Sequence, residues 1–214
     1  MTMPDVPDIR GRLQWIYSSQ DNQDLEKRYD TWAKEYDQDL LSYGYKGPSL
    51  AAGLLCRYLP RQAGPVLDAG AGTGIIGEIM APLGYEDLVA IDLSQGMLEL
   101  ARSKGPYKEL RQMVMGERLD FPDDRFAATM AIGVLTHGHA PPDSLDELIR
   151  VTKPGGYIVF SMRTDAFLNN GFKEKQDALE QGGRWRLVEA TDPVQSLPLA
   201  EEGTMIQMFA YQVV

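Results

Sequence analysis

The spacing of apolar and polar residues along the chain changes after Pro60. Short apolar stretches of strand length then alternate with windows of helical periodicity. The stretches with strand character are 66–67, 88–91, 113–115, 128–135 and 157–162. The helical windows are 75–83, 95–103, 144–151 and 169–180. Strand followed by helix at this spacing is typical of βαβ units, so the pattern predicts a mostly parallel sheet with helices on both faces. Two late stretches, 185–189 and 204–213, predict a closing pair of strands.

The first 60 residues have helical patterns only. Over residues 21–41, apolar and aromatic side chains recur at steps of three and four, which places them on one face of a helix. These residues are Leu25, Tyr29, Trp32 and Tyr36. The opposite face is acidic, and we expect it to face solvent. Its residues are Asp24, Glu26, Asp30, Glu35 and Asp37. A second helix is expected over 49–59.

Composition restricts the class of protein. The chain has 214 residues, 21 basic and 31 acidic side chains, a net charge of −10 and one Cys. This length favours one domain, and a single Cys forms neither an internal disulfide nor a Cys-based zinc site. No apolar stretch approaches the roughly 20 residues of a membrane span, and residues 1–10 lack a signal-peptide pattern. We therefore expect a soluble cytoplasmic protein without a membrane segment.

The acidic balance also bears on partners. Polyphosphate chains and anionic membrane surfaces attract Lys/Arg patches, so a net charge of −10 argues against nucleic acid as a partner. The sequence contains no heptad or apolar stripe that would require an oligomer, which leaves monomer and dimer open.

A glycine-rich loop at 66–74 suggests a cofactor site. Its sequence, VLDAGAGTG, passes from a predicted strand through Gly70, Gly72 and Gly74 into a predicted helix. Glycines allow a ligand to approach the backbone closely, and ligands of open parallel sheets bind at the carboxyl ends of strands. Residues 72–77, GTGIIG, also match the dinucleotide fingerprint, whereas no Gly-Lys-Ser/Thr follows to make a P-loop.

Two acidic residues help to choose between the cofactors. Asp68 is expected at the mouth of the loop, where it would oppose the pyrophosphate of a dinucleotide and favour the cationic sulfonium and amino group of S-adenosylmethionine. Asp92 follows Gly72 by 20 residues, a spacing at which an acidic residue accepts hydrogen bonds from ribose hydroxyls. Ser94 is expected to cap the next helix.

Three ordered motifs resemble those of the class I S-adenosylmethionine-dependent methyltransferases. They are DxGxGxG at 68–74, DLSxxML at 92–98 and KPGG at 153–156. Within that superfamily the chain is similar to the methyltransferase-like family of the Williams–Beuren syndrome region, through residues 29–33, 36–39, 132–135, 151–156 and 163–164. One departure is Phe126-Ala127, where many members have Phe-Asp, and we expect it to remove a structural pairing only.

The resemblance implies an α/β fold: a Rossmann-like αβα sandwich with a mostly parallel seven-stranded sheet, an antiparallel last strand and an N-terminal helical lid. Residues 1–60 would form an arm and the lid, as part of a single domain whose methyltransferase core is 61–214. The implied cofactor is S-adenosyl-L-methionine, with S-adenosyl-L-homocysteine as product.

The resemblance also implies cofactor contacts, and each group of residues has an expected role. The loop residues would surround the methionine moiety, Asp92 would hold the ribose, and Leu93 and Met97 would pack on the adenine. Glu117 and Arg118 would line the polar edge of the adenine, and two tyrosines, with Tyr45, would come from the lid. The candidates are Tyr29, Tyr36, Asp68, Ala69, Gly70, Gly72, Gly74, Asp92, Leu93, Ser94, Met97, Glu117, Arg118, Ile132, Gly133 and Val134.

Candidates for catalysis lie after the fourth predicted strand. Methyl transfer is an in-line displacement that needs a general base only when the acceptor loses a proton. His137 and His139 are the only histidines and are candidate bases, with loop capping as the alternative role. A metal would need a further ligand such as Asp143, so we expect none. Arg163 could meet an anionic acceptor.

The function expected is methyl transfer to a small molecule. Two alternatives stay open: an S-adenosylmethionine-binding regulator or partner without turnover, and a nicotinamide-dependent oxidoreductase, which rests on the literal dinucleotide fingerprint alone.

Overall fold

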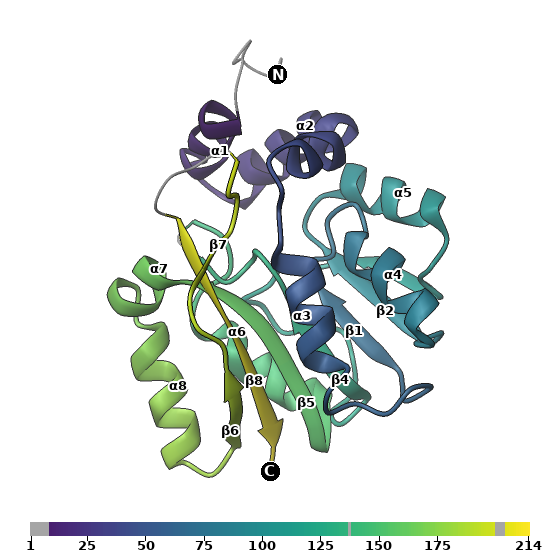
Figure 1. Ribbon diagram of the computed structural model, residues 1–214, viewed down its shortest axis with the longest axis vertical. Coiled ribbons are helices and arrows are strands. Elements are labelled where there is room, and N and C mark those ends of the chain that lie inside the picture. The colour runs from purple at the N-terminus through teal and green to yellow at the C-terminus, as the bar shows by residue number, and fades with distance from the viewer. Residues whose placement is uncertain (1–8, 137, 200–203) are drawn as a thin grey trace.

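A mixed sheet forms the middle layer of the computed structural model, which describes residues 9–136, 138–199 and 204–214 (Figure 1). Its strands are β1 (Val66–Ala69), β2 (Leu88–Asp92), β3 (Glu109–Gln112), β4 (Phe126–Ala131), β5 (Thr152–Arg163), β6 (Trp185–Ala190), β7 (Val194–Gln195) and β8 (Met205–Val213). Their order is β3-β2-β1-β4-β5-β8-β6, with β7 paired to β8. Strands β1 to β5 run parallel and β8 is antiparallel to β5 and β6, as predicted. The two-residue β7 makes the sheet eight-stranded rather than seven-stranded.

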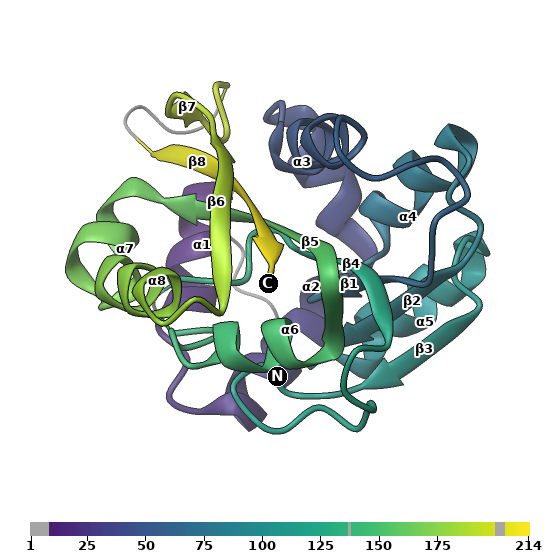
Figure 2. The same ribbon diagram turned by 90° about the horizontal axis from the view of Figure 1, so that it is seen from below.

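Helices cover both faces of the sheet and complete an αβα sandwich (Figure 2). One layer consists of α3 (Gly47–Leu55), α4 (Ile75–Met80, followed by a 3₁₀ turn at Ala81–Leu83) and α5 (Gln95–Lys104). The other consists of α6 (Ser144–Val151), α7 (Thr164–Asn169) and α8 (Phe172–Gln181). Each face of the sheet has its own apolar core: Leu67 points to the α6 side and Val66 to the α3 side. Parallel strands buried on both faces explain why their sequences read as short continuous apolar stretches.

Two N-terminal helices, α1 (Ile9–Tyr17) and α2 (Asn22–Ser42), cross above the carboxyl ends of the parallel strands (Figure 1). Asp21 caps α2 by accepting a hydrogen bond from the Asp24 amide. The aromatic residues share one face of α2, as predicted, and this face packs inward, with Trp32 only 1% exposed in a small core that also contains Ile16. Within the described part of the chain, no helix combines the length and apolar character needed to span a bilayer.

Two residues of the acidic face of α2 are accessible to solvent, as predicted, and also bind other parts of the protein, which the sequence did not predict. Asp30 accepts hydrogen bonds from Ser94 Oγ at 2.5 Å and from the Gly96 amide at 2.8 Å. Asp37 accepts hydrogen bonds from Thr73 Oγ1 and Lys104 Nζ. Carboxylates are stabilised near the amino end of a helix, which is where Asp30 meets α5. These contacts attach α2 to the loops that follow β1 and β2.

Two predicted elements differ from the structure. The third strand is β3, Glu109–Gln112, and not 113–115, because it lies at the edge of the sheet where polar side chains are tolerated. The apolar residues 113–115 follow this strand instead. The helix predicted over 169–180 is α8, which begins later, at Phe172, after Gly171 with φ +79°, and a separate helix, α7, precedes it.

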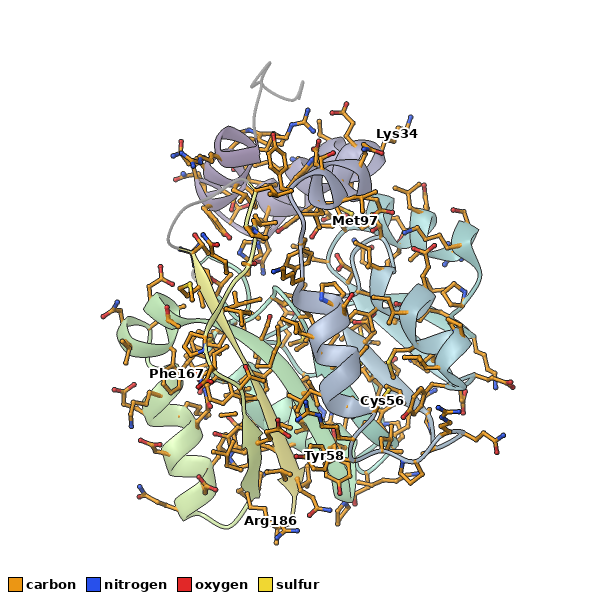
Figure 3. All side chains as sticks on the ribbon, viewed as in Figure 1. Lys34, Cys56, Tyr58, Met97, Phe167 and Arg186 are labelled. Carbon is orange, nitrogen blue, oxygen red and sulfur yellow. The ribbon has the colours of Figure 1, made fainter. Side chains whose placement is uncertain are left out.

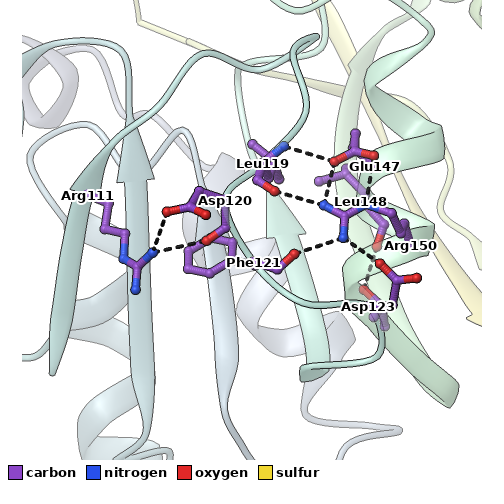
Figure 4. A network of polar contacts seen from close by, with 9 residues as sticks. Arg111, Leu119, Asp120, Phe121, Asp123, Glu147, Leu148 and Arg150 are labelled. Atoms are coloured by element: carbon purple, nitrogen blue, oxygen red, sulfur yellow. Dashed lines mark hydrogen bonds and ion pairs between the residues drawn. The ribbon is translucent and has the colours of Figure 1, made fainter.

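Arg150, at the end of α6, holds the segment between β3 and β4 in place (Figure 4). Its guanidinium donates hydrogen bonds to the carbonyl oxygens of Leu119 and Phe121, at 2.9 and 2.8 Å. It also donates to Asp123, and Glu147 Oε2 accepts from the Leu119 amide at 2.9 Å. This segment follows residues 113–115 in the chain, so the network also helps to hold those residues in place.

Candidate active site

A cavity opens at the carboxyl ends of β1, β2 and β4, beneath α2. Strand β1 lies between β2 and β4, so the cavity occupies the position where the strand order reverses. It is lined by Asn22, Leu25, Tyr29, Tyr36, Gly70, Gly72, Asp92, Leu93, Met97, Met113, Val114, Met115, Ile132, Gly133, Val134, His139 and Ala140. Figure 3 shows Met97 on α5 just below α2. We call this space the first cavity.

The structure brings most of the cofactor candidates together around the first cavity. Those in its lining are Tyr29, Tyr36, Gly70, Gly72, Asp92, Leu93, Met97, Ile132, Gly133 and Val134. The candidates outside its lining are Asp68, Ala69, Gly74, Ser94, Glu117 and Arg118. Glu117 and Arg118 are exposed and do not line the cavity. Residues 113–115 line it instead. The apolar character of those three residues was visible in the sequence, but it was assigned to a strand.

Gly70, Gly72 and Gly77 are each required for a different physical reason. Gly72 has φ +54°, lines the first cavity, and has no atom within 4 Å of the position that a Cβ would take. A Cβ on Gly70 would lie 2.2 Å from Val134 Cγ2, and one on Gly77 would lie 2.5 Å from Tyr107 Cζ. Gly72 therefore keeps the backbone open to a ligand, whereas Gly70 and Gly77 allow close packing within the protein. The last glycine of the dinucleotide fingerprint thus has a packing role.

Asp68 lies behind the loop and not at its mouth as the sequence predicted. Side chains alternate along β1, so Asp68 shares the α3 side with Val66, where Tyr107 is packed. Tyr107 Oη donates a hydrogen bond to Asp68 Oδ2 at 2.5 Å and accepts one from the Gly77 amide at 2.9 Å. Oδ1 of Asp68 is buried without a hydrogen-bond partner. Burial raises the pKa of Asp68 to about 7, with a smaller opposing effect of Tyr107.

Asp92 is held at the end of β2 by two backbone amides. Its Oδ2 accepts a hydrogen bond from the Gly72 amide at 2.7 Å and its Oδ1 accepts one from the Ser94 amide at 2.8 Å. Burial raises the pKa of Asp92, and these backbone hydrogen bonds lower it in part. A carboxylate has about four acceptor positions, so two remain to receive hydroxyl donors from the cavity.

Aromatic side chains of α2 form the roof. Tyr29 Oη lies 2.7 Å from His139 Nε2, and the Tyr36 ring stands edge-on to the Tyr29 ring at 6.4 Å. Burial raises the pKa of both tyrosines well above its usual value, so both phenols are neutral at pH 7. Tyr29 is therefore able to donate its proton to His139. The other candidate base, His137, lies outside the described residues.

A second cavity adjoins the first, and the two share Tyr29, Tyr36 and Gly133. Its lining also includes Leu13, Tyr17, Trp32, Leu40, Tyr45, Leu135, Thr136, Ser161, Arg163, Ser196, Leu197, Thr204 and Ile206. Most of these residues come from α1, α2 and the ends of β5 and β8, which are far apart in the sequence. Only Arg163 among them was singled out as a candidate for substrate contact. Gly133 is fixed at the boundary because its amide donates to Ser161 Oγ at 2.8 Å.

Within the described residues, no group of three or more His, Cys, Asp or Glu side chains is arranged to hold a metal ion.

Comparison with known proteins points in one direction. Residues 67–160 match the family described as "Methyltransferase domain". The chain is 37% identical over 191 residues to Methyltransferase-like protein 27 of Homo sapiens, which covers 84% of this chain and 76% of that protein.

Solved structures share the fold. An S-adenosylmethionine-dependent methyltransferase from Mesorhizobium loti superposes with a TM-score of 0.59 at 19% identity, covering 78% of this chain and 100% of that one. The [4+2]-cyclase SpnF superposes with a TM-score of 0.69 at 15% identity, covering 91% and 97%. At these identities the likeness concerns the fold alone, and the cyclase illustrates that the fold does not determine the reaction.

Proposed function

The chain belongs to the class I S-adenosylmethionine-dependent methyltransferases, and on that premise we propose that it methylates a small molecule bound in the second cavity. The observation that carries this proposal is the pair of adjoining cavities that meet at Tyr29, Tyr36 and Gly133. A small acceptor in one cavity would face a methyl donor in the other. The net charge of −10 supports a small molecule rather than a nucleic acid as the acceptor.

The residues of the first cavity fit S-adenosylmethionine. When bound, this cofactor supplies a methyl group on a cationic sulfonium. Asp92 would accept hydrogen bonds from the ribose hydroxyls through its remaining acceptor positions. Leu93, Met97 and residues 113–115 would enclose the adenine with apolar surface. Gly72 would leave the backbone accessible to the methionine moiety, because a Cβ there would project into open space.

The tyrosines of α2 would orient the reaction. Aromatic ring faces attract cations within about 6 Å of the ring centroid, so Tyr29 and Tyr36 suit a site that holds a sulfonium. Helix α2, which carries both rings, also covers the meeting point of the two cavities and would exclude water from it. Helices α1 and α2 would thus act as a lid within the single domain, whereas α3, which was expected in the lid, packs on the sheet with the core of 61–214, and residues 1–8 lie outside the described residues.

A proton acceptor would be needed for a hydroxyl or amine acceptor. Tyr29 lines both cavities and lies 2.7 Å from His139 Nε2, and His139 lines the first cavity. As the acceptor attacks the methyl group, its proton would pass to Tyr29 Oη, and the phenolic proton would pass to His139 Nε2. General acid–base catalysis of this kind contributes about 10²–10⁴-fold to the rate.

The two alternatives lose support. The nicotinamide-dependent alternative rests on the fingerprint at 72–77 alone, whereas residues 67–160 match a methyltransferase domain. A regulator without turnover is disfavoured because the human relative is named as a methyltransferase-like protein and the chain carries a methyltransferase domain. A cytoplasmic location stays a prediction.

Ligand titration tests the proposal. We expect S-adenosylmethionine and S-adenosylhomocysteine to bind the purified protein in calorimetry, and NADH not to bind. Incubation with S-adenosylmethionine and a panel of small hydroxylated or aminated acceptors should release S-adenosylhomocysteine. Tight binding of NADH without any response to the methyl donor would overturn the proposal.

The ribose contact has a separate test. Asp92→Ala should weaken S-adenosylhomocysteine binding by about 1–3 kcal/mol, the scale for loss of charge-assisted hydrogen bonds. Asp120→Ala is a suitable control, because Asp120 is an exposed carboxylate outside the cavity lining. Equal affinities for Asp92→Ala and the control would contradict the ribose assignment.

A further inference from the structure

The second cavity holds a single charged group among its described lining residues. Arg163, at the end of β5, is this group, and no carboxylate contributes to the lining. The chain as a whole has an excess of ten acidic side chains, and the carboxylate paired with Arg163, Asp165, lies in the lining of the adjoining third cavity. Arg163 is absent from the lining of the first cavity, so it lies on the side away from the cofactor.

Neighbouring residues fix the orientation of Arg163. Asp165 accepts hydrogen bonds from its Nε at 3.0 Å and its Nη2 at 2.7 Å. The guanidinium carbon also lies 5.7 Å from the centre of the Tyr17 ring. A guanidinium has five N–H donors in a fixed fork, and Asp165 occupies two of them. The side chain is therefore preoriented, and donors remain for a ligand.

The strand geometry sets the distance between Arg163 and the meeting point of the cavities. Ser161 and Arg163 both line the second cavity, and residues two apart on a strand are separated by roughly 6–7 Å. Ser161 Oγ accepts a hydrogen bond from the amide of Gly133, the backbone position shared by both cavities. Arg163 therefore lies further along β5 than Ser161, the residue that contacts the shared position Gly133.

Apolar side chains form part of the wall of the second cavity, together with Thr136, Ser161, Ser196 and Thr204. Leu135, Leu197 and Ile206 are buried residues of the cavity wall, and Trp32 closes it from α2. A third cavity continues from the second through Tyr17 and Arg163 toward polar residues of α7. From the first cavity outward, a ligand would therefore meet the cofactor, then the apolar wall of the second cavity, then Arg163, and finally the polar third cavity.

Resting on the proposed function, we infer that the acceptor is a small amphipathic carboxylic acid. Its apolar or aromatic body lies in the second cavity, its nucleophilic group faces the first cavity, and its carboxylate binds Arg163. The carboxylate is the handle and not the methylated group, because Arg163 is remote from the first cavity. Carboxylate and guanidinium match in geometry through paired N–H donors.

A purely structural role of Arg163 makes a different prediction. Arg163 and Asp165 also connect β5 to α7, so loss of Arg163 could loosen that connection. Such loosening would weaken charged and neutral acceptors alike. Selectivity between a carboxylate and its neutral amide therefore separates the two roles.

The experiment uses the S-adenosylhomocysteine-loaded full chain and two matched probes, 3-(4-hydroxyphenyl)propanoate and 3-(4-hydroxyphenyl)propanamide. We expect the carboxylate to bind at least about tenfold more tightly, the scale of one charge-assisted hydrogen bond. Arg163→Gln should remove this preference and Arg163→Lys should retain part of it. Arg186→Gln is the matched control, since Arg186 is exposed at the opposite end of the molecule from α2 (Figure 3).

The outcomes separate the inference from the proposed function. Failure of wild-type protein to bind S-adenosylhomocysteine would refute the proposed function. Normal S-adenosylhomocysteine binding with equal affinity for the two probes, or with neither probe bound, would overturn the carboxylate inference alone. Equal loss of both probes in Arg163→Gln would do the same, and so would a methyl ester as the product. If Arg163→Gln does not fold, Arg163→Lys against Arg186→Gln decides.

Discussion

At the scale of single residues, two neighbouring carboxylates lie in different surroundings. Both oxygens of Asp92 accept backbone hydrogen bonds, whereas Asp68 has one phenolic donor and one buried oxygen without a partner. An unpartnered buried oxygen disfavours the charged form, which agrees with the raised pKa of about 7 for Asp68. Asp92 keeps acceptor positions beyond its two backbone hydrogen bonds, and the raised pKa of Asp68 predicts that stability depends on pH.

Asp68 should make the protein less stable as pH rises. Between its ordinary value of 3.8 and its folded-state pKa of about 7, Asp68 is protonated in the folded chain and ionised in the unfolded chain. Unfolding then releases a proton, so the free energy of unfolding falls across this window. Asp68→Asn should be more stable than wild type above pH 7, by up to about 4 kcal/mol, with a difference that vanishes toward pH 4.

Urea unfolding at pH 4, 6 and 8 measures this effect. Asp87→Asn serves as the control, because Asp87 is a partly exposed aspartate in the loop before β2. The same pH slope in Asp68→Asn and wild type would contradict the assignment.

Tyr29 and His139 should affect turnover more than cofactor binding. Tyr29→Phe removes the hydroxyl that lies 2.7 Å from His139 Nε2 but keeps the ring. For an acceptor that loses a proton, we expect kcat to fall about 10²-fold or more, with little change in S-adenosylhomocysteine affinity. His139→Gln should give a similar loss, and the double variant should lose no more than either single one. Additive losses in the double variant would argue against a shared proton path.

At the scale of elements, the loop between β1 and α4 contains glycines with separate roles, and a pair of substitutions separates them. Gly72→Ala places a methyl group in the first cavity with no protein atom within 4 Å. The left-handed backbone costs roughly 1–2 kcal/mol, so the variant should fold but lose most of its S-adenosylhomocysteine affinity. Gly70→Ala forces a Cβ to 2.2 Å from Val134 and should lower the melting temperature far more.

Thermal unfolding and calorimetry on both variants check this distinction. Gly53→Ala provides a helix control, because a Cβ there also meets nothing within 4 Å. Full cofactor affinity in Gly72→Ala would show that the loop does not approach the ligand.

Acidic residues of α2 bind the two loops that follow β1 and β2. Asp37 binds Thr73 in the loop after β1, and Asp30 binds Ser94 and Gly96 after β2. Any ligand that orders these two loops should therefore also stabilise α2. Helix α2 thus covers the site and is also hydrogen-bonded to the loops beneath it.

At the scale of the whole molecule, this attachment predicts a pattern of protection. Binding of S-adenosylhomocysteine should slow amide hydrogen exchange in α2 and in the loops after β1, β2 and β4. Helix α8 and strand β6 lie at the other end of the sheet order and should change little. Hydrogen exchange with mass spectrometry measures this, with NADH as the control ligand. Protection of the sheet without protection of α2 would contradict the role of α2 as a lid.

The sequence predicted the order of elements because local patterns carry that information. Apolar stretches, helical periodicity and glycine turns depend on near neighbours, so the alternation of strands and helices was readable after Pro60. The prediction was wrong for the third strand, where the polar edge strand β3 lacks the apolar pattern of a central one. The helix predicted over 169–180 is present as α8, but it begins only after Gly171, and the short helix α7 before it was not predicted.

The sequence by itself determined the class of fold, the glycine loop, the position of Asp92 at the end of β2 and the family, since each depends on residues within one strand–turn–helix unit. Only the tertiary structure decided which way Asp68 points, that Asp30 and Asp37 attach the lid, and that Arg163 shares a cavity with Tyr29. These facts arise where segments far apart in the chain meet at the carboxyl edge of the sheet. No local pattern encodes such contacts, because they depend on strand order and on the face toward which each side chain alternates.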